Sequence, residues 1–161
     1  MFGGQTNAPL TIRSIINRGG EQGAQHSQSL HNWFSHIPGL RVVMPYSVQD
    51  ARDLLIASVL CDDPVIFIDD RWLYEEEDNL PEPTELILAE QEPRLLSKGN
   101  DLTIIASGFS TKVACDASKI LQTKYGLSVE IIDLRILSPL KSEKLLYSCL
   151  LYTSDAADEH G

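Results

Sequence analysis

The residue best placed to do chemistry is His26, within Gly-Ala-Gln-His-Ser-Gln at residues 23–28, between a glycine-rich turn and an apolar helix. A histidine that follows flexible backbone can project its imidazole into a cleft. There the positive end of the helix would lower its pKa and favour the neutral form. A histidine that only caps the helix fits the same pattern. His26 is therefore a candidate catalytic residue, and both interpretations stay open.

The other histidines and the cysteines do not form a recognisable metal or nucleophile motif. His26, His31 and His36 follow one another at intervals of five residues, a rotation of about 140° along a helix, so they cannot share one face as metal ligands would. The three cysteines contain no CxxC pair, which disfavours a zinc ribbon or a disulfide framework and predicts a reducing compartment. The motifs GxxxxGK[ST], GxGxxG, GxSxG and HExxH are also absent from the sequence.

Composition narrows the class of protein. With 161 residues, 43% hydrophobic and 22% charged, the chain can bury a core, so disorder is not expected. A net charge of −10 would repel phosphate backbones and anionic lipid, so we expect no nucleic-acid partner and no polybasic membrane contact. The sequence has no apolar run near the roughly 18 residues of a membrane span, and its first five residues do not resemble a secretion signal. We expect a cytoplasmic protein that does not enter a membrane.

Alternating strands and helices must position His26. Residues 10–16 and 41–44 are predicted strands, and residues 64–68 form a short unbroken apolar run that suits a central strand covered on both faces. Two helices are predicted between these strands. One has an apolar face made by Leu30, Trp33, Phe34 and Ile37, and the other opens at Ser47 as a capping box and buries Val48, Ala51, Leu54, Leu55 and Val59.

A change of composition marks the boundary between two parts of the chain. Residues 69–100 are rich in acids and contain three prolines, which is typical of a solvated hinge. A predicted strand at 102–106, a helix that ends at Gly126 and a strand at 127–134 then make a βαβ unit. The predicted helix buries Val113, Ala114, Ala117, Ile120 and Leu121. The sequence therefore predicts an α/β protein with a mostly parallel sheet, divided into a first domain at 1–77, an acidic linker at 78–100 and a second domain at 101–148.

Residues 149–161 do not continue this pattern. They look like the conceptual translation of a transposase-based sequencing adaptor, and we exclude them from fold reasoning as one would a fusion scar. On this interpretation the chain stops within its second α/β domain.

Four separated stretches resemble one family. Residues 23–28, 37–45, 62–67 and 129–140 are similar, in order and in one register, to the beta subunit of the decarboxylating component of 2-oxoacid dehydrogenases. These thiamine-diphosphate enzymes have a transketolase-like fold and act on pyruvate, branched-chain 2-oxoacids or acetoin. The resemblance extends from Met1 to about Ser148 and implies a partial pyrimidine-binding domain followed by the start of the transketolase carboxyl-terminal domain.

The resemblance implies a role for His26. In that family the beta subunit binds the aminopyrimidine of thiamine diphosphate, while an alpha subunit holds the diphosphate through magnesium. His26 matches the family's histidine, which borders the thiazolium carbon, orients the 2-oxoacid adduct and assists proton transfer when the acyl group passes to lipoamide. The expected partners are the alpha subunit, a second beta subunit and a lipoyl-bearing acyltransferase.

The resemblance also implies a structural potassium ion, held by backbone oxygens and a few polar side chains. The matching positions are Leu10, Ser58, Val59, Cys61 and Asp63. Cys61 stands where an aspartate is usual and Asp63 where an asparagine is usual. A thiolate is a poor ligand for a hard cation, so these two departures put the site in doubt.

Other departures concern the whole enzyme. The family's glutamate that protonates the aminopyrimidine would precede Met1, and the magnesium motif is missing, as expected of a beta subunit. We therefore expect the isolated chain to be inactive. A fragment of a single-chain transketolase or deoxyxylulose-phosphate synthase, and a non-catalytic interaction subunit of the same fold, remain alternatives. The segment 71–74 could serve a subunit interface or simply pack at a domain edge.

Overall fold

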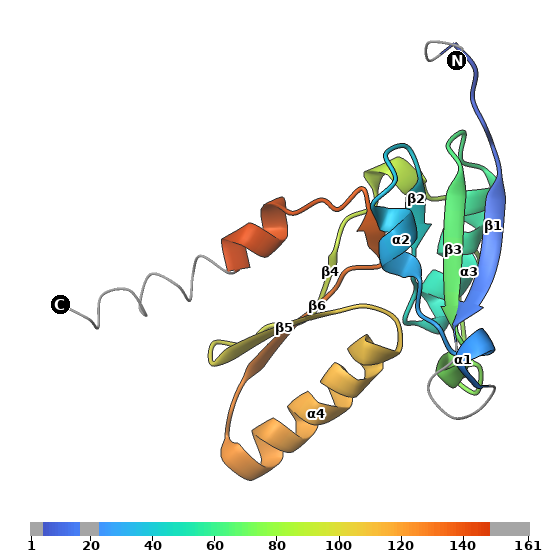
Figure 1. The fold of residues 1–161 in the computed structure, drawn as a ribbon. Helices are drawn as coiled ribbons and strands as arrows, with labels where there is room; N and C mark the ends of the chain where they lie inside the picture. Colours follow the sequence, from blue (N-terminus) through green and yellow to red (C-terminus); the bar gives the residue numbers. More distant parts are fainter. Residues whose placement is uncertain (1–4, 17–22, 149–161) are drawn as a thin grey trace.

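The computed structural model describes residues 5–16 and 23–148. Within these ranges the chain forms two α/β units, each built on its own sheet (Figure 1). The elements in chain order are β1 (Thr11–Ile16), α1 (Gly23–His26), α2 (His31–Ser35), β2 (Arg41–Val43), α3 (Val48–Val59), β3 (Val65–Asp70), the 3-10 turns η1 (Arg71–Leu73) and η2 (Leu88–Glu90), β4 (Arg94–Ser97), β5 (Leu102–Ala106), α4 (Phe109–Tyr125), β6 (Val129–Asp133) and β7 (Ile136–Ser138). Residues 143–148 are also helical. The predicted α/β class is confirmed.

The first sheet has the strand order β1-β3-β2-β7. β1, β3 and β2 are parallel, and all six residues of β3 are buried. The unbroken apolar run predicts this burial for residues 65–68, but not for Asp69 and Asp70. α3 packs on one face of this sheet, where Leu54 and Ala57 meet Val43 and Phe67. α2 lies on the opposite face, where Phe34 packs against the buried cluster Ile16, Val42, Met44, Ile66 and Ile68.

The helices of the first unit bury fewer of the predicted residues than their spacing suggests. Ser47 caps α3 as predicted, because its Oγ accepts a hydrogen bond of 3.1 Å from the backbone N–H of Asp50. Val59 is 64% exposed and Trp33 is 69% exposed, so their predicted burial is wrong. In the last turns of α3 the buried residues are Ala57 and Ser58. α2 has only five residues, and of these Phe34 packs against the sheet.

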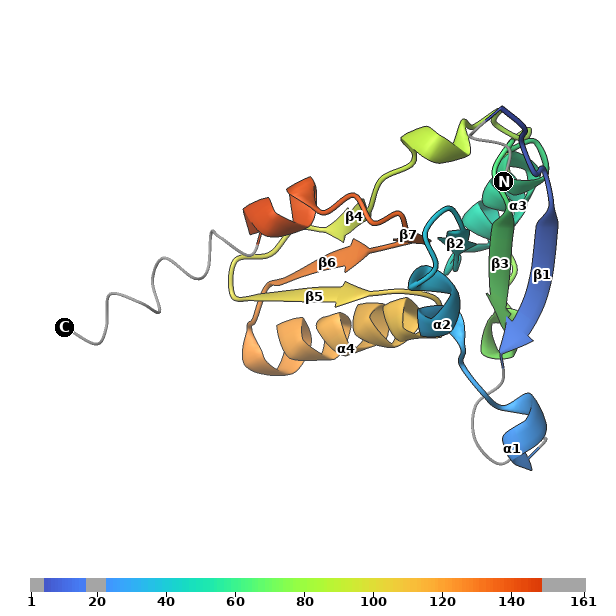
Figure 2. The ribbon, with the colours of Figure 1, turned by 45° about the horizontal axis from the view of Figure 1, so that its top comes forward.

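The second sheet has the order β4-β6-β5, and α4 covers one of its faces (Figure 2). α4 ends at Gly126 in the predicted left-handed cap, with φ at 70° and its N–H bonded to the Gln122 carbonyl at 3.1 Å. Ala114 is buried as predicted, whereas Val113 and Ile120 are about half exposed, at 49% and 51%. α4 therefore buries fewer residues against the second sheet than its apolar pattern predicts.

β7 connects the two units. It follows β6 of the second sheet but pairs antiparallel with β2 of the first sheet. The backbone N–H of Met44 also donates to the Arg135 carbonyl at 2.8 Å. The two units are thus held together by backbone hydrogen bonds as well as by side chains.

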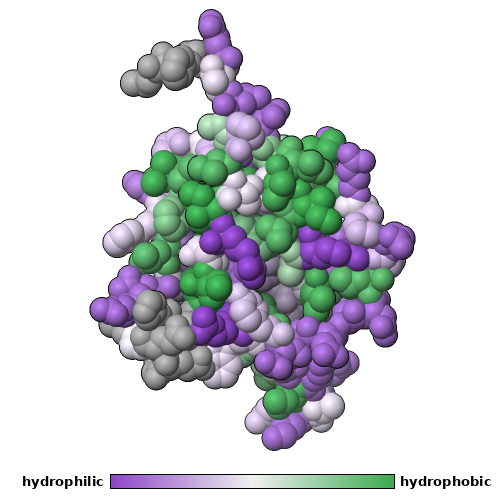
Figure 3. All heavy atoms as spheres, turned by 90° about the vertical axis from the view of Figure 1, so that its right-hand side faces the viewer, coloured by the Kyte–Doolittle hydropathy of each residue, from purple (hydrophilic) through white to green (hydrophobic). Residues whose placement is uncertain are grey.

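β1 lies at one edge of the first sheet, and β7 lies at the other. The β1 side chains Ile12 and Ile15 are exposed, and the face that contains the β1 edge shows apolar patches among polar residues (Figure 3). Exposed apolar side chains on an edge strand are typical of a surface that another strand or a partner covers. No helix in the described part of the chain is long and apolar enough to cross a membrane.

Candidate functional site

The carboxyl ends of β1, β2 and β3 meet at one edge of the first sheet, because these three strands are parallel. In open α/β sheets this edge is where ligands bind. α1 lies beyond the ends of β1 and β3 (Figures 1 and 2). The fold therefore brings the segment that contains His26 to the edge where a cofactor would be expected.

His26 is the last residue of α1, and the next helix begins only at His31. The prediction that His26 stands at the start of a helix is therefore wrong, because its backbone closes α1 instead. Residues 27–30 form no helix and separate His26 from α2. The side chain of His26 lies outside the described part of the structure, so its catalytic role stays a prediction.

A group of polar side chains lies at the same edge. Arg13 on β1 donates from its Nε to Asp69 Oδ2 at the end of β3, and its Nη2 lies 3.3 Å from the Tyr74 hydroxyl. Burial raises the pKa of Asp69, and the Arg13 guanidinium partly offsets this rise. Together with Tyr46 these residues line a cavity of about 250 Å³. The edge thus carries aromatic rings, a guanidinium and a nearly buried carboxyl.

Sequence reasoning missed these acids. Asp69 and Asp70 fall in the stretch interpreted as a solvated hinge, yet they are the last residues of β3 and are only 8% and 2% exposed. Asp70 caps η1, since its Oδ1 accepts from the Trp72 N–H at 3.2 Å. The signal that could have found them is their position directly after the apolar run 65–68 of a buried parallel strand, where strand-end side chains face a ligand edge.

The predicted potassium positions gather at the opposite, amino-terminal edge of the sheet. The Leu10 carbonyl accepts from the Val65 N–H at 2.8 Å, and the Ser58 carbonyl accepts from the Thr11 hydroxyl at 2.8 Å. Asp63 is bound to the Arg41 guanidinium at 2.7 Å, so a cation has already neutralised its carboxylate. The Asp63 side chain therefore does not fit a potassium ion, and the Leu10 and Ser58 carbonyls each already accept a hydrogen bond.

The other two predicted potassium positions, Val59 and Cys61, offer no better side-chain ligand. Val59 offers only its backbone oxygen, and Cys61 has a half-buried free thiol. Among the described residues no group of three or more His, Cys, Asp or Glu side chains could hold a metal ion. A potassium ion here would depend on backbone oxygens alone.

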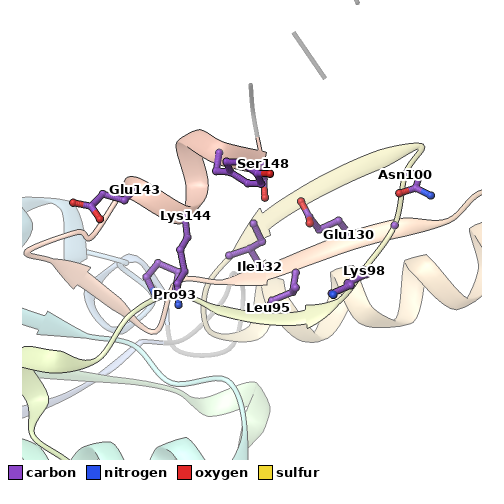
Figure 4. A pocket seen from close by; sticks show the side chains of 11 residues that line it. Pro93, Leu95, Lys98, Asn100, Glu130, Ile132, Glu143, Lys144 and Ser148 are labelled. Atoms are coloured by element: carbon purple, nitrogen blue, oxygen red, sulfur yellow. The ribbon is translucent and has the colours of Figure 1, made fainter. Parts of the chain in front are cut away.

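A larger hollow of about 970 Å³ lies on the second sheet, between its strands and the helical residues 143–148 (Figure 4). Its lining mixes apolar residues such as Leu95 and Ile132 with charged ones of both signs, including Lys144 and Glu130. None of the predicted site residues lines it. The segment that contains His26 lies instead at the carboxyl edge of the first sheet (Figure 1).

Comparison with protein families decides the relationship. Residues 1–76 match the transketolase pyrimidine binding domain, and residues 92–161 match the transketolase C-terminal domain. The chain belongs to the transketolase-like family. Its first matched domain contains both the His26 segment and the strand ends that line the edge cavity.

The curated relatives of this transketolase-like chain are beta subunits. It is 39% identical over 140 residues to the pyruvate dehydrogenase E1 component subunit beta of Rhizobium meliloti, a match that covers 87% of this chain and 30% of the relative. It is 40% identical over 148 residues to the acetoin:2,6-dichlorophenolindophenol oxidoreductase subunit beta of Cupriavidus necator, covering 92% of this chain and 43% of the relative. The chain thus spans less than half the length of these relatives.

Solved structures agree on the fold. A split-gene transketolase, described as an inactive beta4 tetramer, superposes with a TM-score of 0.70 at 24% identity and covers 90% of this chain and 46% of its own. A Pichia stipitis transketolase superposes with a TM-score of 0.64 at 21% identity, covering 86% of this chain and 21% of its own. At this identity the likeness establishes the transketolase-like fold alone.

Proposed function

We propose that this chain is part of the beta subunit of a 2-oxoacid dehydrogenase, which decarboxylates pyruvate or a related 2-oxoacid and passes the acyl group to lipoamide. The observation that carries the proposal is the His26 segment, which lies at the carboxyl edge of a parallel sheet within the pyrimidine-binding match. The curated relatives at 39–40% identity, which are pyruvate and acetoin enzyme beta subunits, support it.

The edge cavity suits an aminopyrimidine. Tyr46 and Tyr74 offer aromatic rings, and Asp69 offers oxygen acceptors beside Arg13, which are the groups that an aromatic ring with an amino substituent needs. When bound, thiamine diphosphate supplies the electron sink for decarboxylation. The protein contributes position and electrostatics around it.

His26 would hold and move the proton. An imidazole titrates near neutral pH, so it can accept a proton and return it within one turnover. We propose that His26 would orient the bound 2-oxoacid and assist the proton transfer that accompanies acyl transfer to lipoamide. The other edge residues would orient the ring and keep water from the reacting carbon.

The partners that we propose follow from the same function. An alpha subunit would complete the cavity and hold magnesium with the diphosphate, and a second beta subunit and a lipoyl-bearing acyltransferase would complete the assembly. The exposed apolar side chains of β1 support a surface that is covered in an assembly.

We propose the cytoplasm as the compartment, in keeping with the free thiols of Cys61 and Cys115. Potassium is proposed only through the backbone oxygens of the amino-terminal edge.

The test is reconstitution of the intact beta subunit that contains this sequence with its alpha subunit. We expect thiamine-dependent decarboxylation of a 2-oxoacid with reduction of an artificial electron acceptor, and no activity from the 161-residue chain alone. Ketol transfer between sugar phosphates by the beta subunit without a partner would favour a transketolase instead. A correctly assembled complex inactive toward every 2-oxoacid and sugar phosphate would indicate a non-catalytic subunit.

A further inference from the structure

A buried group of charged residues lies where the two α/β units meet, and the proposed function does not use it. Asp50 on α3 is 1% exposed, and its Oδ1 receives two guanidinium groups, that of Arg94 on β4 at 2.9 Å and that of Arg135 after β6 at 3.2 Å. A second carboxyl, Asp133, ends β6 and is fully buried. We call Asp50, Arg94, Asp133 and Arg135 the junction cluster.

The two carboxyls of the junction cluster have different partners. Asp50 carries the ion pairs with both guanidiniums, whereas Asp133 Oδ1 accepts only from the Thr111 hydroxyl, at 3.0 Å, among the side-chain bonds of the described structure. Asp133 Oδ2 is buried without a hydrogen-bond partner in that same part of the chain. Arg135 also donates from Nη2 to the Glu92 carbonyl, while its positive charge and its backbone N–H both favour the ionised form of Asp133.

Groups from several elements around Asp133 act on its charge. Asp50 from α3 adds a like charge, and Thr111 from α4 donates a hydrogen bond to Asp133. Burial, a hydrogen bond with Cys115 on α4 and the negative charges of Asp133 and Asp116 raise the pKa of Tyr46, which lies in the loop after β2. Arg135 is the positive charge that acts on Asp133. Arg94 forms an ion pair with Asp50.

Burial is the largest effect at this site. It raises the pKa of Asp133 to about 6, and repulsion from Asp50 adds to the rise, while Thr111 and Arg135 oppose it. An ionised Asp133 therefore needs solvation that the closed junction does not provide.

We propose that Asp133 is a proton-operated switch between the two α/β units: its protonated carboxyl stabilises their contact, and its ionised carboxyl weakens it. Asp133 directly precedes the turn that takes the chain from β6 to β7 and so from the second sheet to the first. Water can reach its Oδ2 only if the elements around it separate. The same turn includes Arg135, which adopts a φ of 55° and accepts the Met44 N–H, so opening here would loosen the contact between the sheets.

A tryptophan at the junction can report this movement. The ring of Trp72, in η1 after β3, lies 5.5 Å from the ring of Phe109, the first residue of α4. In a Trp33→Phe background, Trp72 is the only tryptophan left in the chain. We expect its fluorescence emission to shift to the red as the pH rises, with a midpoint near pH 6.

Two variants and one direct titration decide the proposal. Asp133→Asn should abolish the transition, and the matched control Asp116→Asn, on the exposed face of α4, should leave it unchanged. A transition that persists in Asp133→Asn belongs to another group, such as a histidine, and overturns the proposal. A carbon-13 NMR titration of the unsubstituted chain provides the second test. A carboxyl midpoint near 6 that coincides with the Trp72 transition supports the switch, and a midpoint near the ordinary value of 3.8, or no Trp72 transition, overturns it.

Discussion

Replacing Asp50 with alanine should destabilise the chain more than the loss of any exposed ion pair. Asp50 is 1% exposed and binds the guanidiniums of Arg94 and Arg135, whose side chains are 37% and 7% exposed. The alanine variant leaves the Arg135 charge buried without its carboxylate partner. Breaking a buried pair in this way costs about 3–5 kcal/mol. This is a large share of the roughly 5–15 kcal/mol by which a typical domain is stable.

The assay is urea unfolding of the 161-residue chain, followed by circular dichroism, with the free energy of unfolding taken by linear extrapolation. The matched control is Asp116→Ala, which removes an exposed carboxylate 3.3 Å from Lys119 and should cost less than about 1 kcal/mol. If Asp50→Ala and Asp116→Ala lower the free energy of unfolding equally, Asp50 does not neutralise a buried charge, and the account of the junction cluster is wrong.

Three further predictions use the same unfolding assay. Gly99→Ala should cost about 1–3 kcal/mol, because a Cβ there would lie 2.2 Å from the Val129 carbonyl carbon; a cost of a few tenths would contradict this contact. Ser47→Ala should cost about 1 kcal/mol through loss of the α3 cap, and an unchanged value would show that the hydroxyl contributes nothing. Asp133 binds its proton more tightly when folded, so its own contribution to the free energy of unfolding falls as the pH rises from about 4 to about 6. Relative to wild type, Asp133→Asn should therefore gain about 3 kcal/mol across this interval, and a difference independent of pH would refute the raised pKa.

The parts of the fold that depend on local patterns were predictable from the sequence. The unbroken apolar run before Asp69 gave a buried central strand, the strand at 102–106 matches β5, and Gly126 ends α4 as expected. Each of these features is set by residues close together in the chain, such as a glycine that alone accepts a left-handed conformation easily.

The parts that depend on distant pairing were not predictable. β7 has only three residues, and nothing local indicates that it leaves the second sheet to pair with β2 of the first. Asp69 and Asp70 were interpreted as hinge residues because acidic composition dominates the following segment, although they end a buried strand. A composition window averages over such boundaries, and burial is decided by the elements that pack on each side chain.

The candidate site shows the same division. The order of motifs locates His26 near the cofactor edge, but the helix start assigned to it was wrong, because α1 closes at His26 and α2 opens only at His31. Arg13 and Tyr74 were not predicted, since β1 and the segment after β3 meet only in the folded sheet.

The central claim is that His26 transfers protons at a thiamine site that an alpha subunit completes, and one rate tests it most directly. The measurement is acyl transfer to lipoamide by the assembled complex with His26→Ala, beside the exposed control His36→Ala. We expect the His26 variant to assemble normally and to lose about 10²-fold or more in rate, the usual contribution of a general acid–base group, while the control keeps its rate. An unchanged rate in a correctly assembled His26→Ala complex would contradict the account.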